Sequence, residues 1–269
     1  MFVTRDGARL FYVDEGSGDP PLVLVHGGAV DHTTWDEHIA HWAPKHRVVA
    51  MDLRGHGQSD GTDKFTPDMF RDDLAAILEQ LKLGPAVVVG ASRGGGIANR
   101  VAVDYPELVK ALVMVDYGAA SQKSGAAPWA RTREQTEELL AGFGDEWRTN
   151  GARKLVDSWF PEPDVPESLK ERLANLCRQT PVETVVAIRM MDVDEIDRDD
   201  YLRALKQPLL VLQSSSPQSR HLGTQQGQYI HERVPHSKLK YFEGRGHGFF
   251  MSAPQEFWAA VDGFLEEIG

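Results

Sequence analysis

The sequence predicts an α/β fold in which helices flank a mostly parallel central sheet. Two observations support this class. Short apolar runs alternate with stretches whose apolar residues recur at helical spacing, as in repeated strand–helix–strand units. Most of these runs are apolar at every position, which is typical of strands covered by helices on both faces. The alternation stops after about residue 118 and resumes near residue 206, which indicates an insertion.

The expected elements follow one another in regular order. Residues 9–14, followed by the glycine-rich turn GSGDPP, indicate a hairpin at the edge of the sheet. The run AVVV ends directly in a glycine, as a buried strand entering a tight turn does. The other expected strands cover 22–25, 48–51, 111–115, 208–212 and 239–242, and the expected helices cover 68–83, 97–105 and 254–268.

The stretch from 119 to 205 has a different character. It is rich in charge, its apolar residues recur at helical spacing, and proline and glycine interrupt it. We therefore expect a helical cap over 119–205, inserted into an α/β core formed by 1–118 and 206–269. Because the insertion leaves after one strand and returns to the next, it should lie over the carboxyl edge of the sheet, where open α/β sheets bind ligands.

Charge and composition exclude several classes of partner. The net charge of −11 disfavours nucleic acid and anionic membranes, which need a basic surface. Cys177 is the only cysteine, so no internal disulfide or cysteine-based metal site is possible. No apolar run approaches the roughly 18–20 residues of a membrane span, and no signal peptide is evident. We expect a cytoplasmic monomer or homodimer that binds a small molecule.

The sequence Gly90-Ala91-Ser92-Arg93-Gly94 matches G-x-S-x-G between an expected strand and an expected helix. A serine on such a strained turn is lifted above the sheet, and side chains at the flanking glycine positions would clash. The backbone N–H of Arg93 can face a developing oxyanion at the helix N-terminus. The Arg93 cation itself opposes the helix dipole, so it needs either a nearby carboxylate or a role toward substrate.

The candidate general base is His247 in GRGHGFF, between the last expected strand and the final helix. A loop at the carboxyl edge can bring its ring beside Ser92. Three glycines, at 244, 246 and 248, leave room for a tight loop. We interpret His26 as a brace bonded to backbone, and the histidines of the stretch 32–46, including His38, as surface residues.

These motifs resemble the α/β-hydrolase family. The resembling segments, HGGAVDHTTW, MDLRGHGQSD, GASRGG, LVMVD and GRGHGFFMSAPQEF, occur in the family's order and cover the chain outside the insertion. The resemblance implies that Gly28 supplies a second oxyanion-hole N–H beside that of Arg93. It also implies that the insertion is the family's helical cap.

The triad acid departs from the commonest pattern of the family. Many relatives place it after the penultimate strand, but no Asp or Glu lies between Asp200 and Glu232. Asp116 ends the strand after the nucleophile helix, and relatives such as haloalkane dehalogenases use this position. We therefore predict that the Asp116 carboxylate lies within hydrogen-bond reach of the His247 ring. An uncharged orienter, Ser214 or Ser215, is the alternative. Asp52 is interpreted as a loop brace.

A serine, a histidine and an acid beside an oxyanion hole predict acyl transfer to water, on an ester, a lactone or a related carbonyl compound. No metal and no organic cofactor is expected. Two alternatives remain open. The chain also resembles the cofactor-independent quinolone 2,4-dioxygenases in its acid position and its QSSSPQ loop, in which case His247 and Asp116 act as the base. The fold also serves as a receptor or carrier.

Aromatic residues of the insertion suggest a medium-sized apolar substrate, although packing inside the cap is an equally available role for them. The residues expected to roof the pocket are Trp129, Trp159, Phe160, Met190 and Met191, together with Trp35 and Phe249 from the core.

Overall fold

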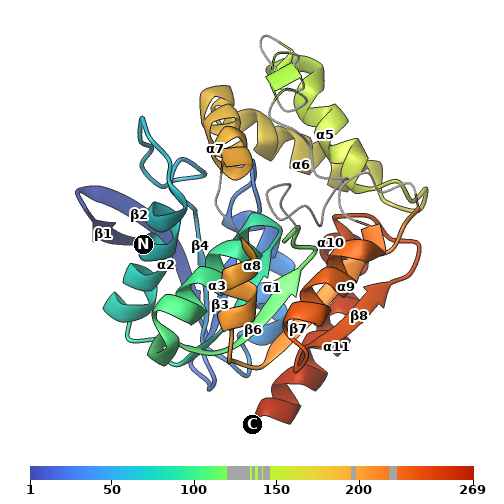
Figure 1. Ribbon diagram of the computed structural model, residues 1–269. Helices are drawn as coiled ribbons and strands as arrows, with labels where there is room; N and C mark the ends of the chain where they lie inside the picture. The colour runs from blue at the N-terminus through green and yellow to red at the C-terminus, as the bar shows by residue number, and fades with distance from the viewer. Residues whose placement is uncertain (120–133, 135–136, 139–140, 142–145, 195–197, 218–222) are drawn as a thin grey trace.

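The computed structural model describes residues 1–119, 134, 137–138, 141, 146–194, 198–217 and 223–269 (Figure 1). Eight strands form one sheet in the order β1-β2-β4-β3-β5-β6-β7-β8, with every pair from β4 to β8 parallel. The predicted α/β class with a mostly parallel sheet is confirmed. The strands are β1 (Phe2–Arg5), β2 (Ala8–Glu15), β3 (Leu22–Val25), β4 (Val48–Met51), β5 (Ala86–Ala91), β6 (Val109–Val115), β7 (Leu209–Ser214) and β8 (Lys238–Phe242).

The hairpin at the sheet edge differs from the prediction. It joins β1 to β2 through Asp6 and Gly7, which both have positive φ, so the turn precedes residue 9 and is not the GSGDPP segment. Asp-Gly is a preferred pair for the positive φ angles of a tight hairpin turn. Strand β2 then pairs antiparallel with β4, which makes it the transition between the hairpin and the parallel sheet.

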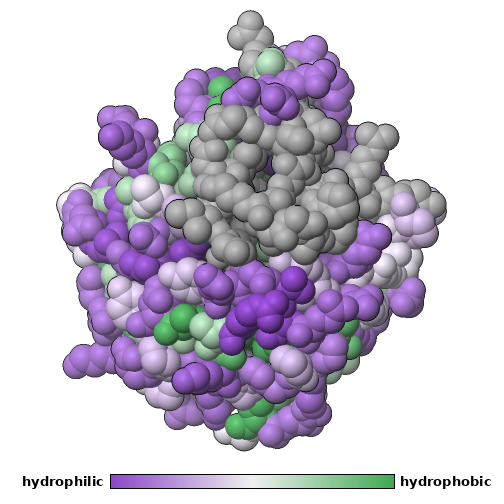
Figure 2. Space-filling view, viewed as in Figure 1, coloured by the Kyte–Doolittle hydropathy of each residue, from purple (hydrophilic) through white to green (hydrophobic). Residues whose placement is uncertain are grey.

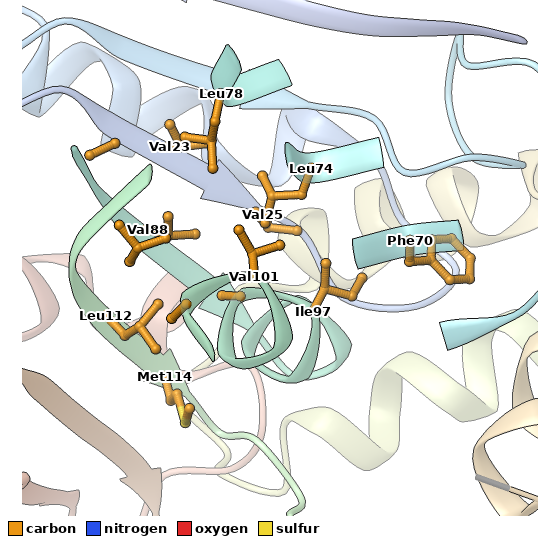
Figure 3. Packing of buried hydrophobic residues seen from close by; sticks show 14 of the residues in the cluster. Val23, Val25, Phe70, Leu74, Leu78, Val88, Ile97, Val101, Leu112 and Met114 are labelled. Atoms are coloured by element: carbon orange, nitrogen blue, oxygen red, sulfur yellow. The ribbon is translucent and has the colours of Figure 1, made fainter. Parts of the chain in front are cut away.

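Helices cover both faces of the sheet, and alternate residues of each strand point to opposite sides. Figure 3 shows Val25, Val88 and Leu112 of the strands packed against Leu74 of α2 and Ile97 of α3. The opposite face packs against α1, α10 and α11. The core helices are α1 (Asp36–Trp42), α2 (Pro67–Gln80), α3 (Arg93–Asp104), α9 (Gly223–Arg233), α10 (Phe249–Ser252) and α11 (Pro254–Ile268), with short 3-10 turns η1 (His32–Trp35) and η2 (Pro106–Leu108).

The cap has a hydrophobic cluster of its own. Trp147, Leu155 and Leu173 are among its buried members, and the cluster extends to Ala29 and Val30 of the core. In Figure 1 the cap helices gather at one end of the molecule, opposite the C-terminus. Its described helices are α5 (Ala152–Trp159), α6 (Glu167–Gln179) and α7 (Val182–Asp194), preceded by a π-helical turn, η4 (Trp147–Gly151).

The last helix within the range expected for the cap contacts helices of the core. Helix α8 (Arg198–Ala204) packs against α3 and α9, and its Leu202 is buried in the same cluster as the sheet. The Tyr201 hydroxyl also donates to Asp104 of α3. The charged stretch that the sequence assigned to the cap therefore contains a helix of the core layer.

The face of the molecule seen in Figure 2 is mostly hydrophilic, with hydrophobic residues in small separate patches. Among the described helices, none combines the length and the apolar character needed to cross a bilayer.

Candidate active site

Ser92 lies between β5 and α3 in a backbone conformation that L-residues rarely adopt, with φ 51° and ψ −115°. Its N–H donates to the Val115 carbonyl at 2.7 Å, which ties the turn to β6. A Cβ added at Gly90 would overlap the Gly94 backbone, and one added at Gly94 would overlap the Val25 carbonyl. The flanking glycines are thus required by close approach of backbone, as the sequence predicted. Such strain is typical of functional sites.

The predicted contact between Asp116 and His247 is present. The His247 Nδ1–H donates to Asp116 Oδ2 at 2.5 Å. The other carboxylate oxygen, Oδ1, accepts the Gln213 side-chain amide and the Ser214 backbone N–H, each at 2.7 Å. Asp116 is buried and ends β6 with φ 48°. The carboxylate is therefore fixed by three donors, and Nδ1 of the ring is fixed as the protonated nitrogen.

The two serines proposed as an alternative orienter take other positions. Ser214 contributes its backbone N–H to Asp116, and the Ser215 hydroxyl donates to the Phe242 carbonyl at 3.1 Å. Asp116, and neither serine, is the residue at His247 Nδ1.

The loop that carries His247 is shaped by its glycines and by the cap. Gly244 has φ +72°. A Cβ at Gly246 would overlap Pro161, and one at Gly248 would overlap the Phe160 ring. The cap segment after α5 therefore lies directly against this loop, and only glycine at 246 and 248 permits that approach.

Hydrogen bonds between the cap and the loop add to this contact. Buried Glu162 accepts the Gly246 N–H at 3.0 Å and the Ser252 hydroxyl at 3.1 Å. The Gly248 N–H donates to the Trp159 carbonyl at 3.1 Å. We call these three bonds the cap–loop clamp. They hold the backbone on both sides of His247.

Loop braces lie on the other side of the serine. His26 Nε2 accepts the Leu53 N–H at 2.9 Å, and the Asp52 carboxylate accepts the backbone N–H groups of His32 and Gln58, each at 2.8 Å. Both residues thus make the backbone bonds that the sequence predicted. The His32 ring, which was expected at the surface, is partly buried and also bonds to Asp52 Oδ1 at 2.7 Å.

Burial and neighbouring charges shift the pKa values of the histidines around these loops. It lowers the pKa of His26, and it lowers that of His56 to about 3, with repulsion from His26 acting in the same direction. Neutral His56 accepts the Ala29 N–H at 3.2 Å, next to Gly28. For His32, burial by itself lowers the pKa, but the Asp52 hydrogen bond and charge outweigh burial and raise it.

Asp31, His32 and Asp52 are the group of described residues whose ligand atoms lie close enough to hold a metal ion. Their oxygens already accept protein donors, since Asp31 accepts the Thr33 N–H and hydroxyl. The group therefore functions as a brace of the loop after β3.

Ser92, His247, Gly28 and Arg93 line one cavity of about 240 Å³ between core and cap. The structure thus brings the predicted nucleophile, base and oxyanion-hole residues to one space, and Asp116 is bonded to the histidine. Much of the remaining wall is apolar. It includes Val30, Phe70, Ile97, Tyr117, Trp159, Val185, Ile188, Met191, Phe250 and Met251.

The expected pocket aromatics are only partly correct. Trp159 lines the cavity, and its ring lies 6.0 Å from that of His247. Trp35, Phe160 and Phe249 do not; they are buried in the hydrophobic clusters. Trp35 packs on Phe250, with ring centroids 4.9 Å apart. Trp129 lies outside the described residues.

Several residues that line the cavity were not predicted from the sequence. Phe250 follows Phe249 directly, and the short helix α10 turns the second phenylalanine, not the first, toward the cavity. On α7, Val185, Ile188 and Arg189 also line it. Their i, i+3, i+4 spacing marks one helix face and was the available signal.

The α/β-hydrolase profile, described as the alpha/beta hydrolase fold, matches residues 20–163. The 3-oxoadipate enol-lactonase 2 of Acinetobacter baylyi is 25% identical over 273 residues, covering 99% of this chain and 96% of that protein. Among solved structures, an esterase from Exiguobacterium antarcticum has a TM-score of 0.89 at 22% identity and 98% coverage of both chains. A bromoperoxidase from Bacillus anthracis has a TM-score of 0.86 at 25% identity and 96% coverage of both. With its sheet order, its serine turn and this match, the chain belongs to the α/β-hydrolase fold family.

Proposed function

We propose that this protein is a serine hydrolase that transfers the acyl group of a small ester or lactone to water. One observation carries the proposal. Ser92 shares a cavity with His247, and the ring of that histidine is held by a buried Asp116 at 2.5 Å. These are the groups that an acyl-transfer enzyme needs to activate an alcohol at neutral pH.

The geometry supports a defined sequence of steps. His247 Nε2 takes the proton of the Ser92 hydroxyl as its oxygen attacks the carbonyl carbon. The backbone N–H groups of Gly28 and Arg93 stabilise the oxyanion that forms. His247 then returns the proton to the leaving alcohol as the bond between that alcohol and the acyl carbon breaks. A water molecule gives a proton to the same ring and attacks the acyl carbon. The bond to the Ser92 oxygen breaks, the acid leaves, and the ring returns the proton to Ser92. Asp116 stabilises the imidazolium in both halves of the reaction.

The dioxygenase alternative needs only the His247–Asp116 pair, with Ser92 in a binding role. Two observations favour the hydrolase. Ser92 lies on a strained turn between a strand and a helix, which is the position of the nucleophile in the G-x-S-x-G pattern. The esterase and the enol-lactonase that resemble this chain over nearly its whole length carry names of hydrolases.

The decisive experiment combines a probe with two variants. The wild type should react with a fluorophosphonate and hydrolyse p-nitrophenyl butyrate, whereas Ser92→Ala should lose labelling and more than about 10³-fold of the activity. Exposed Ser168, on α6, provides the matched control, and Ser168→Ala should retain both. Full turnover in Ser92→Ala, with oxygen consumed on a hydroxyquinolone, would establish the dioxygenase instead. An unlabelled, inactive wild type would indicate a carrier.

A further inference from the structure

Among the described residues that line the cavity, the arginines carry a charge opposite to the net charge of the whole protein. The chain carries a net charge of −11, yet Arg93, Arg100 and Arg189 line the cavity and none of its described lining residues is Asp or Glu. A cleft lined by one sign of charge attracts ligands of the other sign. The serine mechanism needs no cation at these positions.

The Arg93 side chain is placed beside the reacting groups. A Cβ built on Gly28 would lie 3.7 Å from Arg93 Nε and 3.9 Å from one terminal nitrogen, so the guanidinium covers the turn that forms the oxyanion hole. It begins α3, where a cation is unfavourable toward the helix dipole. The proposed mechanism uses only the backbone N–H of this residue, so the acyl-transfer steps themselves give its side chain no role.

The other two arginines come from different elements. Arg189 lies on α7 of the cap, on the same face as Val185 and Ile188. Arg100 lies two turns after Arg93 on α3, over the Tyr201 ring at 4.4 Å and 3.7 Å from Asp68. Core and cap therefore each contribute an arginine to the lining of one cavity. A guanidinium has five donors, so it can hold a carboxylate in addition to its protein partners.

We propose that Arg93 and Arg189 form a carboxylate-binding subsite, and that the substrate is a small ester or lactone that carries a free carboxylate on its acyl part. The inference rests on the hydrolase function proposed above and names its substrate class. The apolar wall takes the carbon chain, and the two guanidiniums take the anion, which favours a substrate with one charged end over a neutral ester of the same size.

Two isosteric substrates test this subsite. The mono-p-nitrophenyl ester of glutaric acid carries the carboxylate, and the matching ester of glutaramic acid replaces it with a neutral amide. The wild-type kcat/KM ratio of acid to amide should exceed about 10, and Arg189→Gln and Arg93→Gln should each lower it about 10- to 100-fold, the loss of one charge-assisted contact. Arg189→Lys should recover part of the ratio. Arg178→Gln removes an equivalent charge from α6 outside the cavity and should leave the ratio unchanged.

A binding measurement separates this inference from the hydrolase proposal. Glutarate should raise the Tm of Ser92→Ala, which cannot turn over, and should raise it less when Arg189→Gln is added. A ratio near 1, or glutarate that shifts neither Tm, would overturn the subsite while leaving ester hydrolysis intact. A wild type inert to both esters, but stabilised by glutarate, would instead refute the hydrolase and keep the carboxylate site.

Discussion

The serine turn and the histidine loop both line the cavity but are held in place by different means. Ser92 is fixed within the core, between adjacent strands of one sheet, by a strained turn and two glycines that admit neighbouring backbone. His247 sits on a loop that two separate regions support. Its ring is bonded to Asp116 of the core, and its backbone is held by the cap–loop clamp through Glu162 and Trp159.

This difference predicts which substitutions should be tolerated. The serine depends on contacts that exist as soon as the sheet forms. The histidine also depends on a segment that reaches the site from about 85 residues away along the chain, as the Gly246–Glu162 bond shows with its separation of 84. Substitutions at the core site should therefore abolish catalytic activity, whereas substitutions in the cap should reduce it only in part.

The largest effect is expected for Asp116→Asn. Gln213 and Ser214 both donate to Oδ1, so the asparagine oxygen must occupy that position and its NH₂ must face His247. The ring then has to accept at Nδ1 and carry its proton on Nε2, and it cannot take the serine proton. We expect kcat to fall by about 10³- to 10⁴-fold with p-nitrophenyl butyrate as substrate.

Asp157→Asn, which removes the same charge from an exposed ion pair on the cap, serves as the control and should remain active. If Asp116→Asn keeps more than a tenth of the wild-type kcat, the histidine is oriented by other groups and the triad assignment is wrong.

A smaller effect is expected for Glu162→Ala. The substitution leaves the Gly246 N–H without its acceptor, at a cost of about 1–3 kcal/mol, and loosens the loop around His247. We expect kcat and the rate of fluorophosphonate labelling to fall by about tenfold, with KM little changed, because the ring is misplaced in a larger fraction of molecules. Glu162→Gln should recover activity, since its amide oxygen can accept from Gly246 and its NH₂ can donate to Ser252.

The matched control breaks a different contact of the same loop. Arg245 pairs with Asp164 at 2.9 Å, but the Asp164 side chain is 61% exposed. Arg245→Gln should change stability by less than about 0.5 kcal/mol and leave labelling unchanged. If Glu162→Ala lowers Tm but not kcat, the clamp only stabilises the fold and the contrast between the two regions fails.

The smallest effect is expected for the protonation of His38, which packs on the core side of the loop that carries His247. His38 stacks with Phe250 of α10 and accepts the Trp258 indole N–H at 2.8 Å. Burial, together with repulsion from His41, lowers its pKa to about 3. The folded state thus holds His38 neutral, and the unfolded state binds a proton below about pH 6.5. Stability from this group is complete above that pH and is lost as the pH falls.

Between pH 7 and pH 5, His38 alone should remove about 2 kcal/mol from the free energy of unfolding. Urea denaturation of wild type and His38→Gln at both pH values measures it, and the variant should have the flatter dependence. If the free energy of unfolding depends on pH equally in both proteins, protonation of His38 does not contribute to the loss of stability in acid.

Local sequence decided the parts of the site whose geometry is set by neighbouring residues. The serine turn, its flanking glycines and the ends of β5 and β6 follow from strand period and turn chemistry, which act over a few residues. The Asp116–His247 pair could also be predicted, because the missing acid after β7 left one strand-end carboxylate in the right order.

Packing between distant segments decided the rest. Trp35 and Phe249 were expected in the pocket, and His38 on the surface, yet all three are buried in one cluster with α11. Helix α8 joined the core although its charged flank resembled the cap. The sequence by itself determined the fold and the order of the elements, and it indicated the residues that we propose as the reacting groups. Only the tertiary structure decided which side of each short helix faces the cavity, because that rotation depends on partners far along the chain.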